Sequence, residues 1–122
     1  MKSNKKTLVF GASLNPGRYS NIAMHRLVGH GYEVVAFGMR KGEVAGVTIE
    51  TEQKQFADVN TITLYMNAQR QAPFYEYLIG LHPKRIIFNP GTENPNFYKL
   101  LRNAHIDFEL ACTLVLLGTD QY

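Results

Sequence analysis

The sequence predicts an α/β protein with a doubly wound, mostly parallel sheet of the Rossmann type, built as three α/β/α layers in a single domain. Strand-like and helix-like segments alternate along the chain, which is typical of parallel α/β architecture. The chain has 122 residues, a length that fits one domain. Its first strand-like run leads into a glycine-containing loop and then into a helical pattern, as in other doubly wound sheets.

The first half of the chain contains two predicted strands and one predicted helix. Residues 7–10 and residues 32–37 are short runs rich in β-favouring residues, which predicts buried strands. Between them, apolar residues recur at helical spacing over 22–28, and Ser20 is the expected N-cap of that helix. Residues 42–51 alternate only in part, which predicts a short strand or a loop.

The second half continues the alternation. Strands are predicted at 61–65, 85–88 and 106–110, the last with the pattern of an edge strand. One helix is expected to begin at Ala72 and Pro73 and to end before Pro83, which cannot continue it. A second helix has Asn94 as its expected N-cap and Pro95 at its first position. Residues 113–117 fit a helix or a strand equally well.

Composition and charge exclude several classes of protein. The longest uninterrupted apolar runs, such as Val34–Phe37, have four residues, whereas a membrane span needs about 20. The formal net charge is +3, and three lysines at positions 2, 5 and 6 account for it. The folded body is therefore near neutral and lacks the basic stripe that a nucleic-acid partner requires. We expect neither a membrane nor a nucleic-acid partner.

The N-terminal residues divide the chain into two predicted parts. Residues 1–6 are expected to form a basic tail, and residues 7–122 the folded domain. The run that follows the tail is too short for the apolar part of a signal peptide, which predicts a cytoplasmic protein.

Cys112 is the single cysteine, so an internal disulfide is excluded. Its apolar neighbours predict a buried structural thiol.

The loop after the first strand has features that suit a phosphate group. Gly11, Ala12 and Ser13 are small, so the backbone can approach a ligand closely. The helix that follows directs free N–H groups and a partial positive charge at the loop, and a guanidinium can hold a phosphate with two hydrogen bonds. The candidate residues are Gly11, Ala12, Ser13, Asn15, Arg18, Tyr19 and Ser20. Alternatively, these residues only form a turn and a cap, because the spacing is not that of a GxGxxG motif.

The end of the second strand distinguishes between ligands. An NAD site has an acidic residue there that binds the ribose hydroxyls, but here Arg40 and Lys41 precede the first acid, Glu43. A cationic strand end favours an additional phosphate on the ribose, as in NADP or coenzyme A. The alternative is a surface turn with two solvated cations.

Two further loops are expected at the same edge of the sheet, because the carboxyl ends of parallel strands meet there. Their candidate ligand-binding residues are Tyr65, Met66, Asn67, Asn89, Pro90 and Gly91. An aromatic and apolar surface at the third strand could pack a ligand's ring or chain, and the asparagines could bond its amide groups. Each of these residues also has an ordinary role in finishing a strand or a turn.

The motif Gly-Ala-Ser-x-Asn-Pro-x-Arg-Tyr-Ser at 11–20 resembles the CoA-binding domain family, and so do residues 88–94 and 111–112. That family includes small stand-alone proteins and the nucleotide-binding domain of the succinyl-CoA ligase α subunit. The resemblance implies a Rossmann fold with coenzyme A across the first loop. It would place the pyrophosphate near Gly11, Ser13, Arg18 and Ser20, and the 3′-phosphate near Arg40 and Lys41. The sequence departs from the family at Gly38-Met39, where many members have Asn-Pro.

Catalytic chemistry is not indicated. The four histidines have no carboxylate or nucleophile at a diagnostic spacing, and no metal-ligand cluster is visible. The sequence therefore predicts non-catalytic binding of coenzyme A or an acyl-CoA. One alternative is a sensor or small reductase that uses NADP(H). Another is a protein-interaction module with a degenerate, empty nucleotide site.

Overall fold

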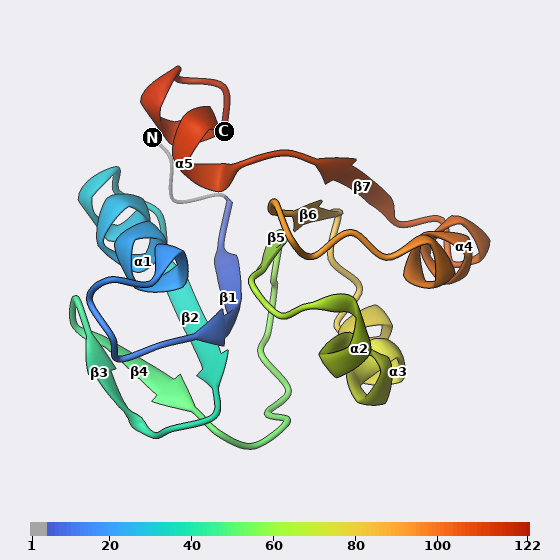
Figure 1. Cartoon of the computed structure of the whole chain (residues 1–122), viewed down its shortest axis with the longest axis horizontal. Helices are drawn as coiled ribbons and strands as arrows, with labels where there is room; N and C mark the ends of the chain where they lie inside the picture. The colour runs from blue at the N-terminus through green and yellow to red at the C-terminus, as the bar shows by residue number, and fades with distance from the viewer. Residues whose placement is uncertain (1–4) are drawn as a thin grey trace.

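A computed structural model describes residues 5–122 of the chain, so the first four residues of the expected basic tail lie outside it. Seven strands form one sheet (Figure 1). They are β1 (Thr7–Ala12), β2 (Val34–Gly38), β3 (Gly42–Val44), β4 (Val47–Glu50), β5 (Thr61–Leu64), β6 (Arg85–Phe88) and β7 (Asp107–Leu110). The helices are α1 (Tyr19–Gly29), α2 (Ala68–Gln71), α3 (Tyr75–Gly80), α4 (Pro95–Asn103) and α5 (Thr113–Gly118), with a 3₁₀ turn, η1 (Ala72–Phe74), between α2 and α3.

The strand order is β3-β4-β2-β1-β5-β6-β7, and every pair except β3–β4 is parallel. The chain first builds outward from β1 through β2 and β4, and then returns to the other side of β1 with β5. The order therefore reverses between β1 and β5, where a crevice opens at the carboxyl ends of the strands. This topology confirms the predicted doubly wound, mostly parallel fold.

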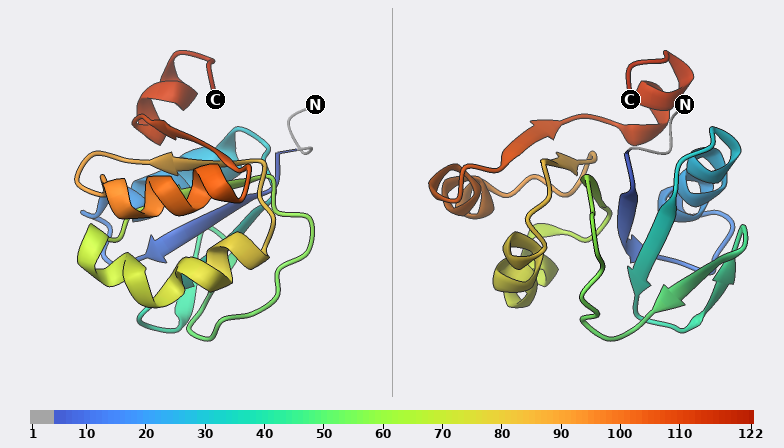
Figure 2. Two further views of the ribbon diagram at one scale, coloured as in Figure 1. Left: turned by 90° about the vertical axis from the view of Figure 1, so that its right-hand side faces the viewer. Right: turned by 180° about the vertical axis from the view of Figure 1, so that it is seen from behind.

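Helices cover both faces of the sheet and define two apolar cores (Figures 1 and 2). Adjacent residues of β1 point to opposite faces, so Phe10 packs in one core and Val9 in the other. The α2–α4 side contains the larger aromatic cluster, in which Phe10 stacks on Phe37 with ring centroids 4.7 Å apart. On the other side, Met24 and Leu27 of α1 and Leu117 of α5 pack against the sheet.

Two helix starts differ from the predictions. Helix α1 has Arg18, not Ser20, at its N-cap, and Ser20 is buried within the first turn. The preceding turn explains the difference, because Asn15 Oδ1 accepts from Gly17 N and Asn15 O accepts from Arg18 N, which starts the helix earlier. The helix expected to begin at Ala72 is preceded by α2, whose N-cap Asn67 accepts from Arg70 N at 3.0 Å.

Three other predictions are settled. Asn94 caps α4 by accepting from Phe97 N, and Pro95 is its first residue, as expected. Residues 113–118 form a helix, which resolves the ambiguity there. The partial alternation over 42–51 corresponds to the antiparallel hairpin β3–β4, whose turn residues Ala45 and Gly46 both have positive φ angles.

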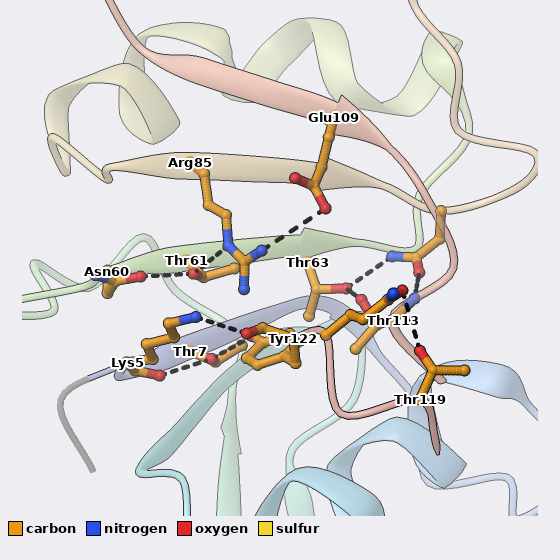
Figure 3. Close-up of polar contacts among 12 residues, drawn as sticks. Lys5, Thr7, Asn60, Thr61, Thr63, Arg85, Glu109, Thr113, Thr119 and Tyr122 are labelled. Atoms are coloured by element: carbon orange, nitrogen blue, oxygen red, sulfur yellow. Dashed lines mark hydrogen bonds and ion pairs between the residues drawn. The ribbon is translucent and has the colours of Figure 1, made fainter. Parts of the chain in front are cut away.

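Lys5 and Thr7 contact Tyr122 at the amino-terminal ends of the central strands (Figure 3). Tyr122 is buried there: its hydroxyl and that of Thr7 share a hydrogen bond of 2.5 Å, and its backbone oxygen accepts from Lys5 Nζ at 2.6 Å. The Arg85 guanidinium lies 4.5 Å from the Tyr122 ring centroid, and its Nη1 is 3.7 Å from Glu109 Oε1.

The division of the chain into a basic tail, residues 1–6, and a folded domain, residues 7–122, remains a prediction. None of the helices formed by residues 5–122 has the length and apolar character needed to cross a bilayer.

Candidate ligand-binding cleft

A cleft of about 650 Å³ lies at the carboxyl ends of β1, β5 and β6. This volume falls within the range of small-molecule sites. Four segments form it: the loop after β1 with the start of α1, the turn after β2, the β5–α2 segment, and the loop after β6. The lining residues are Gly11, Ala12, Ser13, Leu14, Asn15, Arg18, Tyr19, Ser20, Met39, Arg40, Tyr65, Met66, Asn67, Arg70, Pro90, Gly91 and Thr92.

Gly11 allows the two central loops to approach each other. Its φ is +98°, and a Cβ at this position would lie 3.1 Å from the carbonyl carbon of Tyr65 and 3.2 Å from the Met66 nitrogen. Both neighbours are backbone atoms, so they cannot move aside as a flexible side chain could. The residue also interrupts the β1–β2 register between Phe10 and Ala12. A larger residue would therefore push apart the two sides of the cleft.

The first loop and α1 present several amides without protein acceptors. Within residues 5–122, the backbone N–H groups of Asn15, Gly17 and Arg18 donate to atoms of the loop itself. Among the same residues, those of Ser13, Leu14, Tyr19 and Ser20 donate to no other protein group. Because Tyr19 and Ser20 are the first residues of an 11-residue helix, the positive end of the helix dipole adds to the attraction for an anion.

The charged side chains of the lining are all cationic. Arg18, Arg40 and Arg70 line the cleft, and the lining contains no Asp or Glu. All three arginines are exposed, and none forms an ion pair with a carboxylate of residues 5–122. The guanidinium groups are therefore available to an anionic ligand, which the cleft favours by simple Coulomb attraction.

The residues on either side of the turn that contains Arg40 contact the end of β1 and the first loop. A Cβ at Gly38 would lie 2.3 Å from Ala12 O, and a Cβ at Gly42 would lie 2.5 Å from Leu14 Cδ2. Gly38, at the end of β2, therefore allows a close approach to the end of β1, and Gly42, at the start of β3, lies against the Leu14 side chain of the first loop. Leu14 and Met39 remain exposed at 39% and 67%, so they give this side of the cleft an apolar rim beside its cations.

The buried Gln71 side chain links the loops after β5 and β6 by hydrogen bonds. Its side chain is fully buried, and its Nε2 donates to Met66 O and to Thr92 O, each at 2.8 Å. Its Oε1 accepts from Asn94 Nδ2 at 2.9 Å. Met66 and Thr92 both line the cleft, so this one side chain holds two of its walls in register.

A family model and several solved structures match this chain. The CoA binding domain family matches residues 5–118. The chain belongs to the CoA-binding domain family. No curated protein shows significant sequence similarity to it.

Solved structures share the fold of this CoA-binding domain protein along almost its whole length. A crystal structure of an uncharacterized protein is 44% identical, with a TM-score of 0.94, and the match covers 97% of this chain and 98% of that one. A hypothetical protein from Pyrococcus horikoshii OT3 is 25% identical, with a TM-score of 0.85 and coverages of 94% and 82%. A protein from Thermus thermophilus, at 20% identity and a TM-score of 0.83 over 97% and 90%, shows the same fold.

Most of the predicted site residues of the CoA-binding domain line the cleft, and two do not. Lys41 follows Arg40 but is not part of the lining. Asn89 lies behind the lining, where its side chain has a structural role. Its Nδ2 donates to Thr63 Oγ1 and Leu64 O, and its Oδ1 accepts from Thr113 N, the first residue of α5. The cleft brings together Gly11, Ala12, Ser13, Asn15, Arg18, Tyr19, Ser20, Arg40, Tyr65, Met66, Asn67, Pro90 and Gly91.

Four lining residues escaped the sequence predictions: Leu14, Met39, Arg70 and Thr92. Leu14 and Thr92 lie in loops that were expected to frame a site, but neither has a residue type that by itself indicates ligand binding. Arg70 lies in residues 65–71, which were likewise expected to form a loop at the site, but it was not selected as a ligand-binding residue. A signal was present in Asn67, a good N-cap residue three positions before Arg70.

Tyr65 combines a position in the lining with a buried hydroxyl. Its Oη is buried and has no hydrogen-bond partner among the described residues. Burial raises the pKa of Tyr65 from 10.0 to about 12.

Cys112 lies at the N-cap of α5, outside the lining, and is partly exposed rather than buried as predicted. Within residues 5–122, no three His, Cys, Asp or Glu residues gather in a way that could hold a metal ion.

Proposed function

We propose that the protein binds coenzyme A or an acyl-CoA without catalysing a reaction, with the ligand's diphosphate at the loop after β1. The observation that carries this proposal is the set of unpaired amides at Ser13, Leu14, Tyr19 and Ser20, which share the cleft with Arg18. They lie at the reversal point of the strand order, where doubly wound sheets bind nucleotides. Membership of the CoA-binding domain family supports the choice of ligand.

The strength of this site comes mainly from hydrogen bonds to charge. Each hydrogen bond between an ionised group and the protein contributes about 1.5–3 kcal/mol, whereas an exposed helix dipole alone contributes about 0.3–1 kcal/mol. Two or three such bonds from the loop amides and Arg18 are therefore the largest contribution to diphosphate binding. Burial of a ligand's apolar parts against Leu14 and Met39 adds to it.

Arg40 is the residue that we assign to the 3′-phosphate of the coenzyme. It lies beyond β2, the strand whose end faces the ribose in dinucleotide-binding sheets. A basic residue there accommodates a ribose phosphate, and the lining offers no acid that would bind free ribose hydroxyls instead. The neighbouring Lys41, also exposed but outside the lining, provides a natural control.

The composition of the lining supports binding without chemistry. It contains no His, Asp or Glu that could act as the general base needed to activate its serine hydroxyls, and no Cys. The ligand is therefore expected to be recovered unchanged after incubation with the protein. A cytoplasmic location remains a part of this proposal.

Calorimetry with coenzyme A, dephospho-CoA, NADPH and NADH tests the proposed function. Coenzyme A should bind most tightly, and Arg18→Ala should weaken each phosphate-bearing ligand by roughly tenfold or more. Arg26→Ala, which removes an exposed cation of α1 outside the cleft, should have little effect.

The identity of the coenzyme rests on the 3′-phosphate. Dephospho-CoA should bind more weakly than coenzyme A, and Arg40→Ala should abolish that difference, whereas Lys41→Ala should preserve it. Tighter binding of NADPH than of coenzyme A would favour the NADP(H)-dependent alternative. Absence of binding to all four ligands at millimolar concentration, by calorimetry and by thermal shift, would contradict the proposal and favour an interaction module.

A further inference from the structure

Arg70 is a cation of the cleft that the proposed contacts with coenzyme A leave unused. It lies in α2, directly after β5, and its guanidinium has no ion-pair partner among residues 5–122. In the sheet, β5 and β2 flank β1 on opposite sides. Neighbouring strands are about 4.8 Å apart, so Arg70 and Arg40 approach the cleft from two strand ends that are separated by about 10 Å.

The position of β5 indicates which part of a ligand Arg70 meets. In doubly wound sheets the diphosphate lies at the first loop and the adenosine extends toward the end of the second strand. The remainder of the ligand then extends to the other side of β1. For an acyl-CoA, that remainder is the pantetheine arm with its acyl group. The arm carries no charge, so coenzyme A itself offers nothing for a cation there to pair with.

The other groups on the β5–β6 side do not neutralise Arg70. Asn67, Pro90, Gly91 and Thr92 line this part of the cleft and are uncharged. Glu93 follows Thr92 in the loop after β6, but its Oε1 accepts from Gly91 N at 2.9 Å and the residue is not in the lining. An anionic group on the ligand is therefore the natural partner of Arg70.

We propose that the cleft takes an acyl-CoA whose acyl group ends in a free carboxylate, and that Arg70 is the residue that selects it. A guanidinium can hold a carboxylate with two parallel hydrogen bonds, which gives both affinity and orientation. The inference rests on the proposed function, because it requires the coenzyme diphosphate at the first loop. Arg70 acts here as a specificity-determining residue and takes no part in a reaction.

Two pairs of ligands of equal carbon number test this inference by calorimetry. Malonyl-CoA is compared with propionyl-CoA, and glutaryl-CoA with valeryl-CoA, so that only the terminal carboxylate differs within a pair. In at least one pair the carboxylate-bearing member should bind roughly fivefold more tightly, the upper end of what a solvent-exposed ion pair contributes. Arg70→Gln should reduce that ratio to about one. Arg26→Gln, the matched change outside the cleft, should leave it intact.

The outcomes separate this inference from the proposed function. If every CoA ester binds but both ratios are near one in the wild-type protein, Arg70 does not select a carboxylate and the inference is wrong. If a ratio persists in Arg70→Gln, another group selects the carboxylate, and the assignment of Arg70 is overturned. If none of the four esters nor coenzyme A binds, the proposed function fails and the inference fails with it. Circular dichroism of each variant excludes a loss of folding as the cause.

Discussion

Replacing Gln71 by methionine removes the link between the loops after β5 and β6 with little change in volume. Three buried polar groups lose their partner: Met66 O, Thr92 O and one N–H of Asn94 Nδ2. Leaving a buried polar group without a partner costs about 1–3 kcal/mol. The lower end of that range, taken for all three groups, predicts a loss of about 3 kcal/mol. For comparison, the whole free energy of unfolding of a typical domain is about 5–15 kcal/mol.

Urea unfolding followed by circular dichroism measures this loss as a shift of the midpoint at constant slope. Gln69→Met is the matched control, because it makes the same substitution at an exposed position of the same short helix. The control should change the free energy of unfolding by less than about 0.5 kcal/mol. A loss below about 1 kcal/mol for Gln71→Met would refute the argument that this side chain holds the two loops.

Two further predictions concern the cleft. Gly11→Ala should destabilise the protein more than Gly46→Ala, because both glycines have positive φ but only the Cβ at position 11 would meet backbone atoms within 4 Å; equal losses in thermal unfolding would contradict the close approach of the two loops. Tyr65 ionises near pH 10 in the unfolded chain and near pH 12 in the folded protein, so the unfolded state loses its proton first and stability should fall as pH rises from 10 to 12. Between pH 10 and pH 12 the free energy of unfolding of Tyr65→Phe should therefore fall by on the order of 2 kcal/mol less than that of the wild-type protein. Parallel curves of stability against pH for the two proteins would rule out a buried, neutral hydroxyl.

The fold was predictable because its strands are specified locally. Residues 7–10 and 85–88 are short β-favouring runs that end at turn residues, and the alternation of strands and helices then leaves few topologies. The start of α1 was not predictable from its cap residue, since the turn at Asn15 competes with Ser20 and brings the chain into the helix earlier. A similar turn precedes α4, where Thr92 N donates to Asn89 O at 3.0 Å, but it ends two residues before Asn94, and the prediction made there is confirmed.

The site was predictable at the level of loops but only in part at the level of residues. Arg40 and Lys41 look equivalent in the sequence, yet only Arg40 lines the cleft. The turn that carries them is positioned by its flanking strands, since Gly38 of β2 lies against Ala12 of β1 and Gly42 of β3 lies against Leu14 of the distant first loop. Gln71 has the residue type of a solvated helix position. It is buried because two loops that are far apart in the sequence close over it, and no local pattern records that.

A titration of the ¹⁵N-labelled protein with coenzyme A, followed by NMR, tests the phosphate site most directly. The amide signals of Ser13, Leu14, Tyr19 and Ser20 should move the most, because these N–H groups gain an acceptor, while those of β7 at the far edge of the sheet should stay in place. The first loop has no part in recognition if these four signals remain fixed at saturating ligand, or if the largest changes occur elsewhere.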